Sequence, residues 1–192
     1  MNIEDQKAAW LAKAYPHQKV WFESRDQPYR NILVERQCGI TTAMAVEAYI
    51  QAKESGCLQV MIAPTVSQAE IFRQYILQYL EVSAEDLKSC MLFMSPKTFL
   101  AGRGYSNFAV YFCDYLWMKP DVLADLERVL AKHYKSVRQT WFSARTPDIK
   151  HRLLEQVTHK HDGGGESIGY GADLFNAHID ADRLARELNK SS

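Results

Sequence analysis

A glycine and two threonines stand where an apolar segment passes into a helix-forming segment. The stretch "NILVERQCGITTAMAVEAYIQA" (31–52) predicts a buried strand, a turn and a helix. Backbone N–H groups at the start of such a helix bind phosphate, and Gly39 permits the close approach that this requires. Thr41 or Thr42 then supplies a hydroxyl group for Mg²⁺. The pattern is therefore compatible with a phosphate-binding loop, but on this pattern alone an ordinary helix start ranks ahead of it.

The lysine that reaches the outer phosphates in such loops is missing, because Ile40 stands at its position. We expect Arg36, at the end of the strand, to supply the positive charge. The same glycine and threonines are also ordinary helix-capping residues, so a plain strand–turn–helix is the alternative. Nucleotide chemistry also needs carboxylates on a neighbouring strand, and "VYFCDYLW" (110–117) offers Asp114 alone. A strand that merely ends in one exposed aspartate is the alternative there.

Strands that alternate with helices must position these residues. Buried strands are predicted at 31–35, 58–64, 108–114 and 137–144, and helices at 3–15, 41–53, 66–80, 120–133 and 148–157. Segments 91–94 and 98–102 are predicted to form a short hairpin around Ser95 and Pro96. This alternation predicts a three-layer α/β fold with a mainly parallel sheet and helices on both faces.

Polar clusters follow four of the predicted strands, at the carboxyl ends where parallel sheets bind ligands. The clusters are Gln37, Gly39, Thr41 and Thr42; Pro64, Thr65, Ser67 and Gln68; Cys113 and Asp114; and Ser143, Arg145 and Thr146. We expect a single site along this edge of the sheet.

The composition fits one globular domain. Apolar residues make up 47% of the 192 residues, and Lys+Arg and Asp+Glu balance at 23 each, so no overall basic field indicates nucleic acid. We expect a soluble cytoplasmic protein, because no apolar run reaches membrane-spanning length and the four cysteines form no close pair. Residues 1–158 are predicted to form the main domain, and residues 159–192 a glycine-containing linker and a short helix.

Taken in order, these segments resemble the ATPase domain of the large terminase subunits, the motors that pump DNA into the capsids of tailed phages. "ERQCGITT" (35–42) is similar to the phosphate loop of the branch that reads RQxGAT. "YPHQKVWFE" (15–23) resembles the segment whose glutamine contacts adenine, and "RQTWFSARTP" (138–147) resembles the coupling motif. Further similar segments are "MIAPTVSQAEIFRQYI" (61–76), "FLAGRGYSNFAVYFCDYLW" (99–117) and "GYGADLFNAHIDADRLAREL" (169–188). The resemblance runs from about residue 15 to residue 188.

This resemblance implies a P-loop NTPase-like fold that uses ATP and Mg²⁺. The nucleotide-binding residues that it implies are Gln18, Gln37, Gly39, Thr41 and Thr42; the catalytic residues are Arg36 and Asp114; the Mg²⁺ ligands, through water, are Thr41 and Asp114; and the coupling residues are Ser143, Arg145 and Thr146. The implied partners are the phage portal, other terminase subunits and double-stranded DNA. A homo-oligomeric ring is the implied assembly.

The sequence departs from the family pattern at the acid pair. Cys113 stands at the position of the Mg²⁺-binding aspartate, and Asp114 at that of the catalytic glutamate. A thiol is a poor partner for Mg²⁺, and the shorter aspartate displaces the carboxylate that orients the attacking water. We therefore expect weak nucleotide binding with slow or absent hydrolysis. We also expect no nuclease domain in this polypeptide.

Two principal functions fit this pattern. One is an active packaging ATPase, in which Arg36 and Arg145 replace the lysine. The other is a non-catalytic binding or regulatory protein that docks on a terminase, a portal or DNA and modulates packaging. A prophage remnant without function is a third alternative. A helicase would need a second domain, and a dinucleotide-binding domain would need GxGxxG, so both rank lower.

Overall fold

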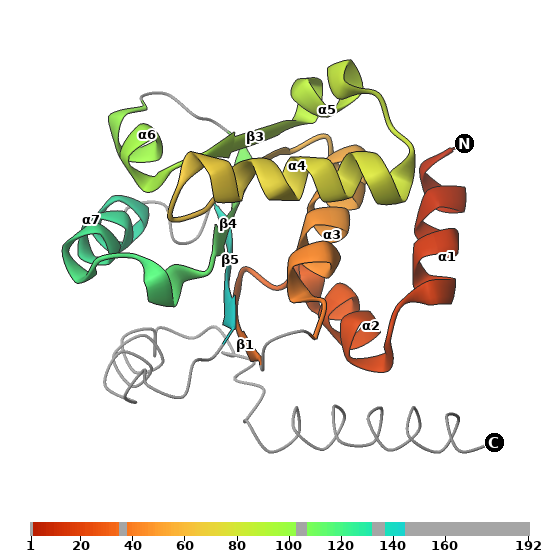
Figure 1. The fold of residues 1–192 in the computed structure, drawn as a ribbon, viewed down its shortest axis with the longest axis horizontal. Helices are drawn as coiled ribbons and strands as arrows, with labels where there is room; N and C mark the ends of the chain where they lie inside the picture. The colour runs from red at the N-terminus through yellow and green to blue at the C-terminus, as the bar shows by residue number, and fades with distance from the viewer. Residues whose placement is uncertain (1, 35–37, 103–106, 132–136, 145–192) are drawn as a thin grey trace.

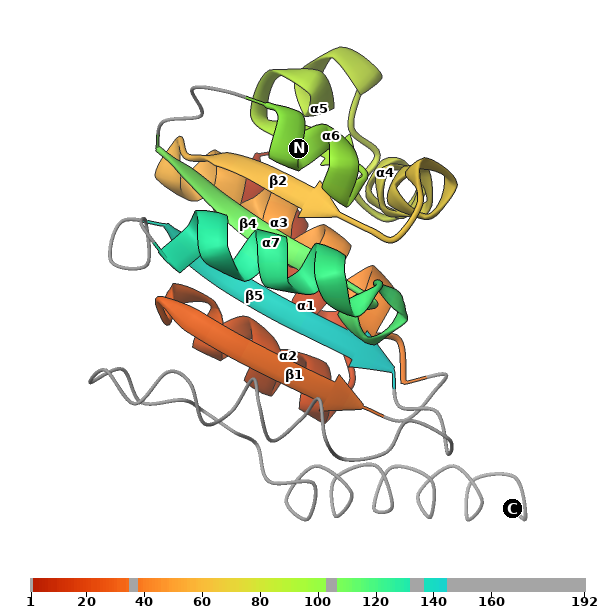
Figure 2. The same ribbon diagram turned by 90° about the vertical axis from the view of Figure 1, so that its left-hand side faces the viewer.

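Five parallel strands form one sheet in the computed structural model, which describes residues 2–34, 38–102, 107–131 and 137–144. The strands are β1 (Tyr29–Val34), β2 (Leu58–Ile62), β3 (Met91–Met94), β4 (Phe108–Cys113) and β5 (Arg138–Ala144). Their order in the sheet is β1-β5-β4-β2-β3, and every neighbouring pair runs parallel. Figure 2 shows four of these strands, β1, β5, β4 and β2, side by side. The predicted α/β fold with a parallel sheet is confirmed.

Helices cover both faces of this sheet. The α-helices are α1 (Ile3–Lys13), α2 (Pro16–Glu23), α3 (Ile40–Ser55), α4 (Val66–Leu80), α5 (Ala84–Cys90), α6 (Pro96–Ala101) and α7 (Pro120–Ala131), and the 3-10 turns are η1 (Ser24–Asp26) and η2 (Tyr115–Trp117). Figure 1 shows the sheet edge-on, with α1, α2 and α3 on one side and α7 on the other. The three predicted layers are therefore present.

The side chains of β4 alternate between the two layers, as a strand buried on both faces requires. Tyr111 and Cys113 join the apolar cluster that contains the buried residues of α3 and α4. Val110 and Phe112 join the second cluster, which contains the buried residues of α6 and α7. The last residue of the strand, Cys113, therefore faces the layer of α3.

The hairpin predicted for residues 91–102 is wrong. β3 pairs with β2 in parallel, and the segment after it forms helix α6. The hydroxyl of Ser95 accepts a hydrogen bond from the backbone N–H of Thr98, and Pro96 occupies the first turn. Both features start helices, because they satisfy or remove N–H groups that have no partner in the first turn.

The sequence analysis also missed two helices. The first predicted helix ends near Pro16, but that proline begins a second helix, α2, in which it stands in the first turn. Helix α5 follows Ser83, whose side chain accepts a hydrogen bond from the N–H of Asp86. Both helices are short, and their apolar periodicity extends over too few residues to be recognised.

A buried ion pair joins β1 to α3. The guanidinium of Arg30 donates to both carboxylate oxygens of Glu47, and the two side chains are 2% and 1% exposed. Arg30 also donates to the hydroxyl of Thr140 on β5 at 2.8 Å and to the carbonyl of Trp21 at the end of α2, also at 2.8 Å. The hydroxyl of Tyr111 on β4 donates to Glu47 at 3.1 Å. One network therefore fixes α2 and α3 relative to the central strands.

Candidate functional site

Gly39 begins helix α3 in a left-handed conformation. Its φ of 74° and ψ of 21° lie in the region that glycine adopts at little cost. Its carbonyl accepts the first intrahelical hydrogen bond, from the N–H of Ala43 at 3.1 Å. No side chain caps the first turn within the described part of the chain. The N–H groups at this helix start therefore point out of the helix toward the carboxyl edge of the sheet, as in an anion site.

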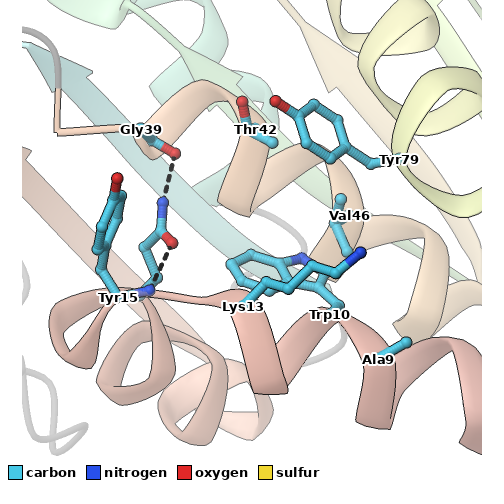
Figure 3. A pocket seen from close by; sticks show the side chains of 9 residues that line it. Ala9, Trp10, Lys13, Tyr15, Gly39, Thr42, Val46 and Tyr79 are labelled. Atoms are coloured by element: carbon cyan, nitrogen blue, oxygen red, sulfur yellow. Dashed lines mark hydrogen bonds between the residues drawn. The ribbon is translucent and has the colours of Figure 1, made fainter.

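Two side chains of helix α2 hold this loop through hydrogen bonds to backbone carbonyl groups of the loop. The ring Nε2–H of His17 donates to the carbonyl of Cys38 at 2.9 Å, because a carbonyl oxygen can only accept. The amide nitrogen of Gln18 donates to the carbonyl of Gly39 at 3.1 Å. The amide oxygen of the same glutamine accepts from the N–H of Tyr15 at 3.0 Å, and dashed lines in Figure 3 mark these two bonds. Two successive carbonyls are thus held toward α2.

These carbonyl contacts set the direction of the N–H groups. In a trans peptide the C=O and N–H bonds point to opposite sides, and no cis peptide occurs in the described residues. The N–H groups of Gly39 and Ile40 therefore point away from α2. The positive end of the α3 dipole lies at the same place. The loop thus has the arrangement that binds a phosphate group.

A side chain at position 39 would destroy this contact. A β-carbon there would lie 2.5 Å from the amide nitrogen of Gln18. The left-handed backbone adds strain for any residue other than glycine. Gly39 is thus required for two reasons: its backbone is left-handed, and Gln18 leaves no space for a β-carbon.

A cavity of about 300 Å³ opens beside the loop. It is lined by Ala9, Trp10 and Lys13 of α1, Tyr15 and Gln18 of α2, Gly39, Thr42 and Val46 at the start and on one face of α3, and Tyr79 of α4. Figure 3 shows Tyr15 and Tyr79 on opposite sides of the first turn of α3. The volume lies at the lower end of the range for small-molecule sites, about 300–1,000 Å³.

One wall of this cavity holds a polar group without a partner. The indole Nε1 of Trp10 is buried and has no hydrogen-bond partner among the described residues. An unsatisfied buried donor costs about 1–3 kcal/mol.

The carboxyl end of β4 carries Cys113 and Asp114. Cys113 is fully buried, and burial, followed by the charge of Asp114, raises the pKa of its thiol well above the usual range. Asp114 is partly exposed and has a φ of 48°, so the chain turns sharply there into η2. The residue of this pair that faces the α3 layer is therefore a neutral thiol.

Several known proteins are similar to this chain in sequence or in fold. The chain is 28% identical over 86 residues to the terminase ATPase subunit of Escherichia phage P2, a match that covers 44% of this chain and 15% of that relative. The predicted resemblance to terminase ATPases is confirmed. No family model matches the chain.

Two solved structures share the fold. The UvsW helicase of bacteriophage T4 aligns with a TM-score of 0.59 at 13% identity, over 82% of this chain and 65% of the helicase. The N-terminal domain of the DNA packaging ATPase of bacteriophage phi29 aligns with a TM-score of 0.53 at 14% identity, over 75% of this chain and 86% of that domain. At these identities the likeness is one of fold, and the fold is that of P-loop ATPases.

The structure brings together three of the residues that the terminase resemblance implicates. Gln18, Gly39 and Thr42 line the same cavity. Thr41 lies beside them in the first turn of α3. Asp114 lies at the same edge of the sheet but does not line the cavity, and Ser143, near the end of β5, is fully buried. Arg36, Gln37, Arg145 and Thr146 lie outside the described residues.

The described residues offer few direct ligands for the Mg²⁺ that the resemblance implies. Within the described part of the chain no three His, Cys, Asp or Glu side chains come together as metal ligands. Mg²⁺ prefers oxygen ligands in octahedral geometry, and Cys113 offers sulfur. The two ligands that the resemblance implies both lie among the described residues: Thr41 is in the first turn of α3, and Asp114 follows β4.

Several residues of the site escaped the sequence analysis. His17 stands next to Gln18, so the quoted segment contained it, but nothing in its spacing indicates the contact with Cys38. Trp10, Lys13 and Tyr79 come from helices whose packing side by side is a tertiary feature.

No helix in the described residues is long and apolar enough to cross a membrane.

Proposed function

We propose that this chain is a terminase-like domain that binds an adenine nucleotide at the start of α3. The single observation that carries the proposal is the pair of hydrogen bonds from side chains of α2 to carbonyl groups of the loop. His17 and Gln18 donate hydrogen bonds to the carbonyls of Cys38 and Gly39. The loop N–H groups therefore point away from α2, toward the place where an anion would bind. The similarity to the P2 terminase ATPase subunit supports the same function.

Gln18 is suited to distinguish adenine from guanine. Its amide uses one donor and one acceptor on the backbone, which leaves one N–H and one oxygen lone pair. Adenine presents a donor and an acceptor side by side at N6 and N7, whereas guanine presents two acceptors there. The remaining pair of groups on Gln18 therefore complements adenine. The cavity beside it would hold the base, with the phosphates at the helix start.

The proposed hydrolysis is slow or absent. Phosphoryl transfer depends on positioned positive charge and on a carboxylate that orients the attacking water. Ile40 leaves the usual lysine position of phosphate loops without a charge, as in the RQxGAT branch, and Cys113 replaces the aspartate of the family pattern. The loss of both contributions favours the role of a binding or regulatory protein over that of a motor. A terminase subunit, a portal or double-stranded DNA would be its partner, and the role in packaging would be modulation.

Calorimetric titration with a non-hydrolysable ATP analogue tests this function. We expect saturable binding by the wild-type protein and none by Gly39→Asp, which places a carboxylate in the loop and a β-carbon against Gln18. Absence of heat up to millimolar nucleotide would contradict nucleotide binding. A terminase-shaped binding protein would then remain, and its partner would be sought with purified portal and terminase.

A further inference from the structure

We propose that this site takes its adenine nucleotide in the metal-free form, so that Mg²⁺ adds nothing to binding. This inference rests on the proposed function and deepens it, because it defines the ionic form of the ligand. It departs from the Mg²⁺ use that the terminase resemblance implies.

The first observation concerns Ile40 and Cys113, which belong to the same buried apolar cluster. Ile40 is the first residue of α3 and is 5% exposed, and Cys113 is the last residue of β4 and is 0% exposed. Cys113 occupies the position at which the family pattern carries the Mg²⁺-binding aspartate, whereas Ile40 occupies a position that has no lysine in the RQxGAT branch either. A buried, neutral thiol thus replaces a carboxylate in the layer beneath the loop.

Cys113 keeps this layer neutral. A carboxylate there without a cation beside it would be an uncompensated buried charge, which is strongly destabilising. Ile40 and Cys113 are instead both packed among apolar side chains.

The second observation concerns the effect of a carboxylate on phosphate. A carboxylate facing the α3 layer at the end of β4 repels a nucleotide phosphate unless a cation lies between them. Cys113 removes this repulsion from the α3 layer, because it presents a buried thiol in the same direction, and it leaves the partly exposed Asp114 as the carboxylate at this strand end. Metal-free phosphate can then approach the helix start without a bridging ion. The attraction that remains comes from the loop N–H groups and the α3 dipole.

The third observation is that the contacts expected for the rest of the nucleotide need no metal. Gln18 offers amide groups to the base, and the cavity walls include the aromatic side chains of Trp10, Tyr15 and Tyr79. Lys13 lines the same cavity and adds a positive charge. These contacts act equally on nucleotide with and without Mg²⁺.

The test compares the dissociation constant for ADP in MgCl₂ with that in EDTA, using the wild-type protein at constant ionic strength. We expect binding in EDTA to be as tight as in MgCl₂ or tighter. Binding that tightens about tenfold or more in MgCl₂ would overturn the inference and leave nucleotide binding intact, since it would show a metal bridge of the usual strength. Absence of binding in both buffers would instead overturn the proposed function and this inference with it.

A variant that restores the carboxylate sharpens the test. In Cys113→Asp we expect weaker ADP binding in EDTA and recovery in MgCl₂, because the new carboxylate repels bare phosphate and accepts a metal-bound one. Cys113→Ser is the matched control, since its side chain is similar in size and neutral, and we expect it to behave as the wild type. Equal ADP affinities for Cys113→Asp in the two buffers would contradict the inference. If the aspartate variant does not fold, the wild-type comparison decides alone.

Discussion

The amide nitrogen of Gln18 lies 3.1 Å from the carbonyl oxygen of Gly39 and occupies the space that a side chain at residue 39 would need. A β-carbon there would be 2.5 Å from that nitrogen. The left-handed glycine and the buried glutamine, 6% exposed, therefore depend on each other. Through this contact, helix α2 determines where the loop N–H groups point.

The first prediction compares two left-handed glycines. Gly39 and Gly56 have φ of 74° and 64°, so alanine at either position meets a conformational cost of about 1–2 kcal/mol. Only Gly39→Ala also collides with Gln18, because a β-carbon on Gly56 meets nothing within 4 Å. We expect Gly39→Ala to lose nucleotide affinity by about tenfold or more, the equivalent of one disrupted buried hydrogen bond. Calorimetric titration checks this.

Gly56→Ala controls for backbone strain in that experiment. It caps the far end of the same helix, α3, and we expect it to lower the melting temperature without changing the affinity. Equal losses of affinity in the two variants would mean that the helix as a whole, rather than the contact with Gln18, determines binding.

The second prediction concerns Gln18→Glu. A carboxylate can accept from the N–H of Tyr15 but cannot donate to the carbonyl of Gly39, so the loop loses one anchor. We expect affinity for the ATP analogue to fall by about tenfold, and the preference for adenine over guanine to fall with it. Titration with the ATP and GTP analogues measures both effects.

Gln6→Glu is the matched control for this substitution. The amide of Gln6 also donates to a backbone carbonyl, that of Leu80 at 3.0 Å, but this residue does not line the cavity. We expect it to leave both affinity and base preference unchanged. A preference for adenine that survives in Gln18→Glu would show that another group reads the base.

Strands and long helices could be predicted from the sequence because each carries its own periodicity. The limits of α4 agree with the prediction at 66–80, since fifteen residues supply several turns of apolar spacing. The sequence placed Gly39 and Thr42 at the carboxyl edge of the sheet, and both line one cavity with Gln18, but the described residues of the other three polar clusters do not line it. These features are encoded locally or by general rules of parallel sheets.

Features that depend on packing could not be predicted. The segment after β3 is too short for its apolar spacing to distinguish a strand from a helix. It forms a helix, and the side chain of Ser95 caps its first turn. The cavity walls from α1 and α4 come from helices whose positions the sequence pattern does not specify. The same holds for the contact between His17 and Cys38, which joins segments 21 residues apart.

The third prediction concerns the buried pair of Arg30 and Glu47. Glu47→Gln leaves the guanidinium buried without its counter-charge, so we expect a loss of about 3–5 kcal/mol in the free energy of unfolding. The double variant Arg30→Met/Glu47→Leu removes both charges, and we expect it to be more stable than the single variant. Urea unfolding measures both. A double variant less stable than Glu47→Gln would show that the bonds from Arg30 to Trp21 and Thr140 outweigh the ion pair.

The last prediction is that the ion pairs of Glu54 make the free energy of unfolding depend on pH. Glu54 of α3 contacts Lys7 of α1 at 2.5 Å and Arg25 of η1 at 3.3 Å. Partial burial raises the pKa of Glu54, but the hydrogen bonds and charges of Lys7 and Arg25 outweigh it, so the pKa is lowered overall. A carboxylate with a lowered pKa in the folded state stabilises the fold above its unfolded pKa, and the contribution is lost as the pH falls through the folded pKa.

We therefore expect wild type to exceed Glu54→Gln in the free energy of unfolding near neutral pH, by about 1 kcal/mol or less for this partly exposed pair. The difference should shrink as the pH falls below the usual carboxyl range and the glutamate becomes neutral. Glu4→Gln is the control, because Glu4 approaches the same Lys7 only at 3.7 Å and its side chain is 69% exposed. Urea unfolding at a series of pH values measures all three proteins. A difference between wild type and Glu54→Gln that stays constant down to acid pH would mean that α1 is held by packing alone, with no contribution from the charge of Glu54.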